Sequence, residues 1–94
     1  MNRTKTYFDT LNVSDPQFQH TIDVIRGTLR RINKRNRVIG GPQFFLRVRG
    51  RLGKNNPYAP LYGVDGPLHR YCAQEINIGH AKRADLYIST RSGR

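Results

Sequence analysis

The chain has 94 residues, and its 17 Lys and Arg against 6 Asp and Glu give a formal net charge of +11. A chain of this length forms one domain, residues 1–94, with a single modest core, and it excludes modules separated by linkers. The apolar content of 36% is below the average for globular domains, but the apolar positions recur periodically, which argues against full disorder.

The first regular element is expected near the amino end. Residues 1–5 are polar and expected to be flexible, as are residues 91–94, while Tyr7 to Val13 alternates loosely enough for a short strand or an extended lead-in. Ser14 to Gln17 then predicts a helix start, in which the Ser14 hydroxyl accepts from a free amide and Pro16 occupies an early position.

A long amphipathic helix is predicted next. Apolar residues recur at steps of four and three, which places them on one stripe of a helix from about Asp15 to Lys34 or Arg35. The stripe consists of Phe18, Ile22, Ile25, Leu29 and Ile32. At helical spacing Arg26, Arg30 and Lys34 lie on one side of this stripe, and Arg31 and Arg35 lie on the other.

The segment Gln43 to Leu52 alternates as a strand does. One face would collect Phe44, Leu46 and Val48, and it would pack beneath the helix. The other face would carry Arg47, Arg49 and Arg51 about 6.6 Å apart, which is close to the spacing of successive phosphates on a nucleic-acid strand. The alternative interpretation is an edge strand whose charges protect it from aggregation.

The second half of the chain predicts a loop and a hairpin. Gly53 to Leu68 holds three Pro and three Gly and reads as an irregular loop, in which Tyr58 and Tyr62 either stack on bases or fasten the loop to the body. His69 to Ile78 and Ala84 to Thr90 are then expected to form an antiparallel hairpin with Lys82 and Arg83 at its tip. The predicted fold class is α+β, with one amphipathic helix on a small, mainly antiparallel sheet in the order β-α-β-β-β.

The charge is concentrated in one part of the chain. Between Val24 and Val64 there are ten Arg and Lys and no Asp or Glu, which is typical either of a solvated face or of a site for a polyanion. We favour the polyanion site, and hence noncatalytic nucleic-acid binding (DNA or RNA) through phosphate contacts with low sequence specificity. The candidate residues are Arg26, Arg30, Lys34, Arg47, Arg49, Arg51, Lys54, Tyr58, Tyr62, Lys82 and Arg83. A homodimer would double this basic surface.

Two other functions fit the composition. An inhibitor or adaptor would dock its basic face on an acidic host protein, and a metal-independent ribonuclease would use His20, His69 or His80 for proton transfer. No phosphate-cradling glycine loop or metal-ligand spacing occurs, so neither a cofactor nor a metal is expected.

Cys72 is the single cysteine and is expected to be buried. A lone cysteine, the lack of a signal peptide and the lack of an apolar spanning segment predict a cytoplasmic protein, of a size and charge typical of small accessory proteins of phages, viruses or bacteria.

Overall fold

The fold is helical throughout the part of the chain that the structure describes. A computed structural model places residues 14–63 and 66–91 in helices and connecting turns, and no strand occurs among them. The predicted β-α-β-β-β arrangement is therefore wrong, because residues 14–63 and 66–91 contain no sheet for a helix to cover. The expected lead-in strand at Tyr7 to Val13 and the expected flexible ends, apart from Arg91, lie outside the described residues.

The long helix α2 (Pro16–Lys34) confirms the predicted amphipathic helix. Its five stripe residues are all at most 1% exposed, as the spacing of four and three requires. The cap differs from the expectation, because Asp15 is the N-cap residue in place of Ser14. The carboxylate of Asp15 accepts a hydrogen bond of 2.9 Å from the Gln17 backbone N–H, and Pro16 then takes the first helical position.

Helix α3 (Gly41–Leu52) replaces the predicted strand at Gln43 to Leu52. Phe44 and Val48 are buried. A spacing of four residues would place them on one side of a helix and equally on one face of a strand, so the helical and the strand period both fit them. Leu46 separates the two possibilities, since it would share the buried face of a strand but is 60% exposed on the helix. A contact with α5 also favours the helix: a Cβ at Gly41 would lie only 2.7 Å from the Cβ of Ala73, so the two backbones approach closely there.

Helices also replace the predicted hairpin. After the short α4 (Ala59–Tyr62), helix α5 (Pro67–Asn77) and helix α6 (Ala81–Arg91) occupy the region assigned to two strands. Cys72 and Ile76 are fully buried at a spacing of four, whereas the apolar residues Ile78 and Leu86 are more than half exposed. The burial of Cys72 was predicted correctly, and it raises the pKa of the thiol far above its usual value.

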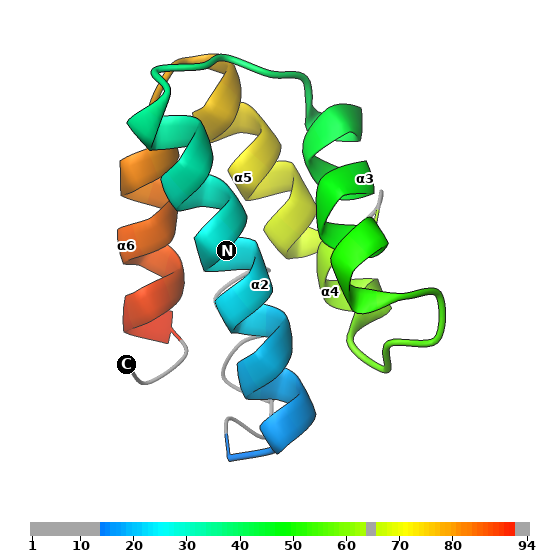
Figure 1. Cartoon of the computed structure of the whole chain (residues 1–94). Helices are drawn as coiled ribbons and strands as arrows, with labels where there is room; N and C mark the ends of the chain where they lie inside the picture. The colour runs from blue at the N-terminus through cyan, green and yellow to red at the C-terminus, as the bar shows by residue number, and fades with distance from the viewer. Residues whose placement is uncertain (1–13, 64–65, 92–94) are drawn as a thin grey trace.

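The helices close around one core. In Figure 1, α2 lies between α6 and α3, and α5 completes the arrangement by packing against both α3 and α6. At one end of the bundle α2 and α5 finish in the same way, with Asn36 and Gly79 in the left-handed region at φ 51° and 80°. The N–H of the next residue, Arg37 or His80, then bonds a carbonyl five residues back, which is the Schellman motif.

Candidate nucleic-acid interface

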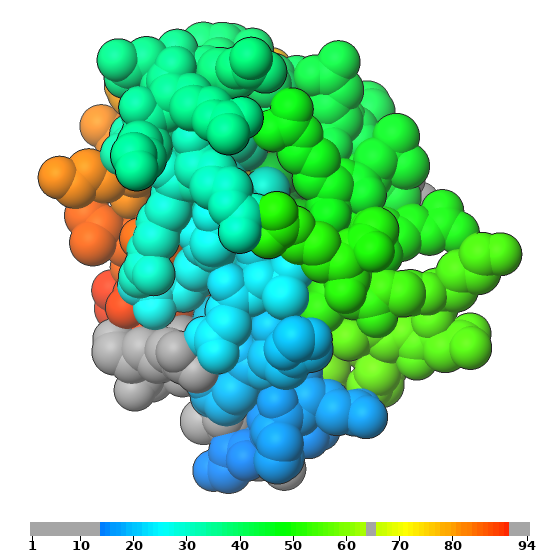
Figure 2. Space-filling model, viewed as in Figure 1, coloured from blue at the N-terminus to red at the C-terminus, as the bar shows by residue number. Residues whose placement is uncertain are grey.

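A groove runs between α2 and α3 on the face that Figure 2 shows, where side chains of the carboxyl-terminal half of α2 (cyan to blue-green) adjoin those of α3 (green). Its volume is about 520 Å³. Five of its nine lining residues are arginines, contributed by α2, by the turn after it and by α3. We call it the arginine groove, and its lining consists of Thr28, Arg31, Ile32, Arg35, Arg37, Leu46, Arg47, Gly50 and Arg51.

Helical spacing produces the two walls. Arg31 and Arg35 are four residues apart on α2, so they lie one above the other beside the buried stripe. Arg47 and Arg51 have the same spacing on α3. Because α2 packs against α3, these two pairs become opposite walls of one groove.

Arg37 reaches the groove because of the turn that ends α2. The left-handed conformation of Asn36 reverses the chain, and the Arg37 backbone N–H donates to the Ile32 carbonyl over 3.1 Å. Arg37 also lines a small hollow of about 90 Å³ that includes Ala81, the first residue of α6. Arg37 therefore lies where the groove meets the end of the bundle at which α6 begins.

The groove arginines are exposed and without carboxylate partners in the described part of the chain. The ion pairs that arginines form there go to Asp85 and involve none of the five. Like charges placed together on a small domain repel one another and disfavour the compact state. The arrangement therefore costs stability unless an anion neutralises it.

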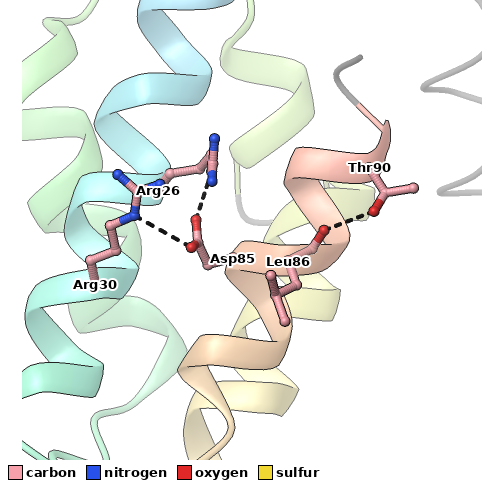
Figure 3. A network of polar contacts seen from close by, with 5 residues as sticks. All are labelled: Arg26, Arg30, Asp85, Leu86 and Thr90. Atoms are coloured by element: carbon pink, nitrogen blue, oxygen red, sulfur yellow. Dashed lines mark hydrogen bonds and ion pairs between the residues drawn. The ribbon is translucent and has the colours of Figure 1, made fainter. Parts of the chain in front are cut away.

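On the opposite side of α2, two arginines meet a carboxylate. The Arg26 Nε lies 2.6 Å from one oxygen of Asp85 and the Arg30 Nε lies 3.4 Å from the other (Figure 3). Asp85 is 9% exposed, and the side chain of Arg26 is 13% exposed. Both residues were predicted to bind nucleic acid, but the structure uses them to join α2 to α6.

The predicted row of Arg47, Arg49 and Arg51 does not exist, because it depended on a strand. At about 100° per residue, Arg49 is turned about 200° away from Arg47 and lies outside the groove lining. Arg49 instead lies near Tyr62, where burial raises the pKa of the phenol and the positive charge of Arg49 opposes that rise. Only Arg47 and Arg51 of the three face the groove.

The remaining predicted cations lie apart from the groove. Lys34 is exposed but does not line it, and Lys82 and Arg83 are exposed in the first turn of α6. Lys54 lines a second hollow of about 540 Å³ beside the start of α2, together with Gln17, His20 and the loop after α3. The structure brings together two of the predicted cations, Arg47 and Arg51, and adds three others.

The two predicted tyrosines pack against the body of the protein. Tyr62 is 2% exposed in the core. Tyr58 is partly buried, with its ring edge-on to Phe18 at 5.3 Å between centroids, and its hydroxyl donates to the Asp15 carboxylate. That hydrogen bond, with the one from the Gln17 amide, lowers the pKa of Asp15. Both rings thus fasten the loop to the helices, which was the alternative to base stacking.

The histidines do not come together into a catalytic pair. His69 is buried near the start of α5 with its ring 5.7 Å from that of Phe45, and His80 follows the end of α5, where its Nδ1 lies 3.4 Å from Glu75. At 1.5 Å per residue the helix separates the two by roughly 16 Å. His20 is exposed on the first turns of α2. Nor do the described residues contain a cluster of three or more His, Cys, Asp or Glu suited to a metal ion.

Comparison with known proteins gives no further guide to function. The chain matches no protein-family model, no curated protein sequence and no solved structure. Among the described residues, no helix combines the length and the apolar character needed to cross a membrane.

Sequence reasoning missed Arg31, Arg35, Arg37, Leu46 and Gly50 as groove residues. A signal for two of them was present, because helical spacing already set Arg31 and Arg35 apart from Arg26 and Arg30. The opposite wall could not be recognised, because a strand at Gln43 to Leu52 would not place Arg47 and Arg51 beside α2 in this way. Arg37 had no local signal, since only the turn at Asn36 directs it toward α3.

Proposed function

We propose that this protein binds nucleic acid without catalysis, and that the arginine groove holds the phosphate backbone. The observation that carries the proposal is the convergence of five exposed arginines from separate stretches of sequence on one groove, with no carboxylate partner among the described residues. In this proposal the protein acts in the cytoplasm beside its nucleic acid.

The chemistry of arginine supports a phosphate ligand. The guanidinium is planar, carries its charge at all physiological pH values and presents paired N–H donors that match two phosphate oxygens. Two arginines on each wall, one helical turn apart, offer such donors from both sides of a backbone. Contacts of this kind carry little sequence information, so binding of low specificity is expected.

The test compares the removal of three groove charges with the removal of three charges elsewhere. The groove variant carries Arg35→Gln, Arg47→Gln and Arg51→Gln, and the control carries Arg49→Gln, Lys54→Gln and Arg70→Gln. All six residues are exposed, so both variants are expected to fold. Binding to a labelled random-sequence oligonucleotide is measured at several salt concentrations by fluorescence anisotropy.

The groove variant should lose most of the affinity and about two units of the slope of log K against log salt. Each phosphate contact contributes about 0.7 to 0.9 to that slope, so the loss counts contacts. The control should keep a slope close to that of the wild type. If both variants weaken equally, net charge explains the binding and the groove is not the site. If the wild type binds no oligonucleotide but retains an acidic protein from a nuclease-treated lysate, the adaptor function replaces this one.

A further inference from the structure

Two features of the arginine groove have no use in the fold. Leu46 points an apolar side chain into the groove and is 60% exposed. Gly50 follows one turn later on the same wall, and a Cβ added there would meet nothing within 4 Å. Gly in a helix interior costs about 1 kcal/mol relative to Ala, and a leucine that is 60% exposed gains little from burial.

These two residues give the groove an apolar part between its charged walls. Gly50 lies between Arg47 and Arg51 along α3, one turn after the first and next to the second, and Leu46 adjoins Arg47. Phosphate alone does not need an apolar contact. A ligand that alternates charged and flat apolar groups would use both parts of the lining, since arginine planes and aliphatic side chains both stack on bases.

The groove favours a single strand over a duplex. Its volume of about 520 Å³ is in the range of about 300–1,000 Å³ that is typical of small-molecule sites, which matches a short stretch of one strand with a base. In a duplex, moreover, the base faces are stacked inside the helix and are not available to Leu46. In a single strand they are exposed.

We infer that the arginine groove is a site for single-stranded nucleic acid, in which the arginines hold phosphates and the space over Gly50, beside Leu46, takes a base. This inference rests on the proposed function and goes beyond it, because electrostatic binding to a backbone does not require a preference for unpaired strands.

The test fills the space without changing the charge. Gly50→Leu adds a side chain inside the groove, whereas Gly27→Leu adds the same side chain to α2 at another helical glycine outside the groove lining, whose added Cβ also meets nothing within 4 Å. Both variants replace a helical glycine, so neither should destabilise the fold, and circular dichroism checks this. Leu46→Ala, which removes the exposed apolar contact, serves as the second variant.

The probes are deoxyuridine and uridine oligomers of about 12 nucleotides, within the range of about 4 to 16 that single-strand-binding domains cover. A hairpin duplex of the same length is the third probe. Because the two oligomers share the phosphate and base chemistry, tighter binding of either one than of the duplex supports the inference, and the difference between them identifies the preferred sugar.

We expect Gly50→Leu to weaken single-strand binding about tenfold while leaving the salt slope and duplex binding unchanged, and Leu46→Ala to weaken it by a smaller factor. Gly27→Leu should bind as the wild type does. Equal affinity of the wild type for single strands and duplex would overturn the inference, as would equal binding by the Gly50 and Gly27 variants. In both cases the proposed function stands if binding still depends on the groove arginines. If the wild type binds none of the probes, the proposed function fails as well.

Discussion

The two sides of α2 carry the same kind of residue in the same spacing but meet different partners. Arg26 and Arg30, four residues apart, face α6, where Asp85 neutralises them. Arg31 and Arg35, also four residues apart, face α3, where the wall opposite them carries further arginines. We call these sides the α6 flank and the α3 flank. The facing helix, and not the charge of α2 itself, therefore decides which cations serve the fold.

The energetics of the two flanks differ accordingly. On the α6 flank Arg26 and Asp85 are largely removed from water, whereas the side chain of Arg30 stays 61% exposed. Burial of a charge is tolerated only when a partner compensates for it. On the α3 flank the charges remain in water and repel one another, so the contact between α2 and α3 depends on apolar residues such as Ile32 and Val48. The α6 flank should therefore respond strongly to the loss of its carboxylate partner. The α3 flank should respond strongly to the addition of an anionic partner.

Asp85→Ala should give the largest effect on stability. The substitution leaves the guanidinium of Arg26 largely buried without its partner, and we expect a loss of about 2–3 kcal/mol in the free energy of unfolding, measured by urea denaturation. Replacing both buried members, as Arg26→Met with Asp85→Leu, should recover much of this loss because no buried charge is left unpaired; Arg30, the other partner of Asp85, is 61% exposed to water. A single variant as stable as the wild type would show that the ion pair does not hold α6 to α2.

Leu46→Glu gives the α3 flank the carboxylate that it lacks. The exposed side chain lies in the groove lining beside the arginines, so the new carboxylate should compete with phosphate and weaken nucleic-acid binding at least tenfold, or about 1.4 kcal/mol. The free energy of unfolding should rise by less than about 1 kcal/mol, as is usual for an exposed ion pair. Fluorescence anisotropy and urea denaturation measure the two effects.

Leu86→Glu is the matched control. Leu86 is 57% exposed on α6, and its replacement by Glu makes the same change in charge away from the groove. It should weaken binding only slightly. Equal weakening by both substitutions would mean that total charge determines affinity and that the two flanks do not differ in function.

Some elements were predicted correctly and others wrongly, because their sequences differ in how clearly the local spacing of apolar residues fits one period. Helix α2 was predictable because five apolar residues spread over several turns fit only the helical period, and because Pro16 marks its start. In α3 only Phe44 and Val48 are fully buried apolar residues, and a pair four apart fits both periods. The close contact between Gly41 and Ala73 that favours the helix joins residues far apart in sequence, so no local pattern contains it.

The segment that was wrongly predicted to form a hairpin does contain a pattern that indicates a helix. Leu68, Cys72 and Ile76 recur at steps of four, and the segment is poor in β-branched residues, which strands prefer. The charge of the site was also predictable from the sequence, since every groove arginine falls within the acid-free stretch. Which of those arginines face one another was not predictable, because it depends on the packing of α2 against α3.

The two flanks also differ because, on the α3 side, a loop as well as a helix contacts α2. The loop after α3 returns to the start of α2 through neutral donors: the Asn56 amide donates to the Thr21 hydroxyl over 3.1 Å, and the Tyr58 hydroxyl donates to the carboxylate of Asp15. Asp15 is more exposed to solvent than Asp85, which is 9% exposed, so its contribution should be smaller.

Tyr58→Phe should therefore lower stability only slightly, and in a way that depends on pH. The hydroxyl lowers the folded-state pKa of Asp15 below its ordinary value of 3.8, so the stabilisation is fully present above that value and is lost as the pH falls through the folded-state pKa. Melting temperatures of wild type and Tyr58→Phe should differ near neutral pH and converge in strong acid. In an Asp15→Asn background, which keeps a residue suited to capping α2 but cannot titrate, the effect of Tyr58→Phe should no longer change with pH. A difference between the two proteins that stays constant down to strong acid would show that Tyr58 acts through its packing on Phe18 and not through the carboxylate.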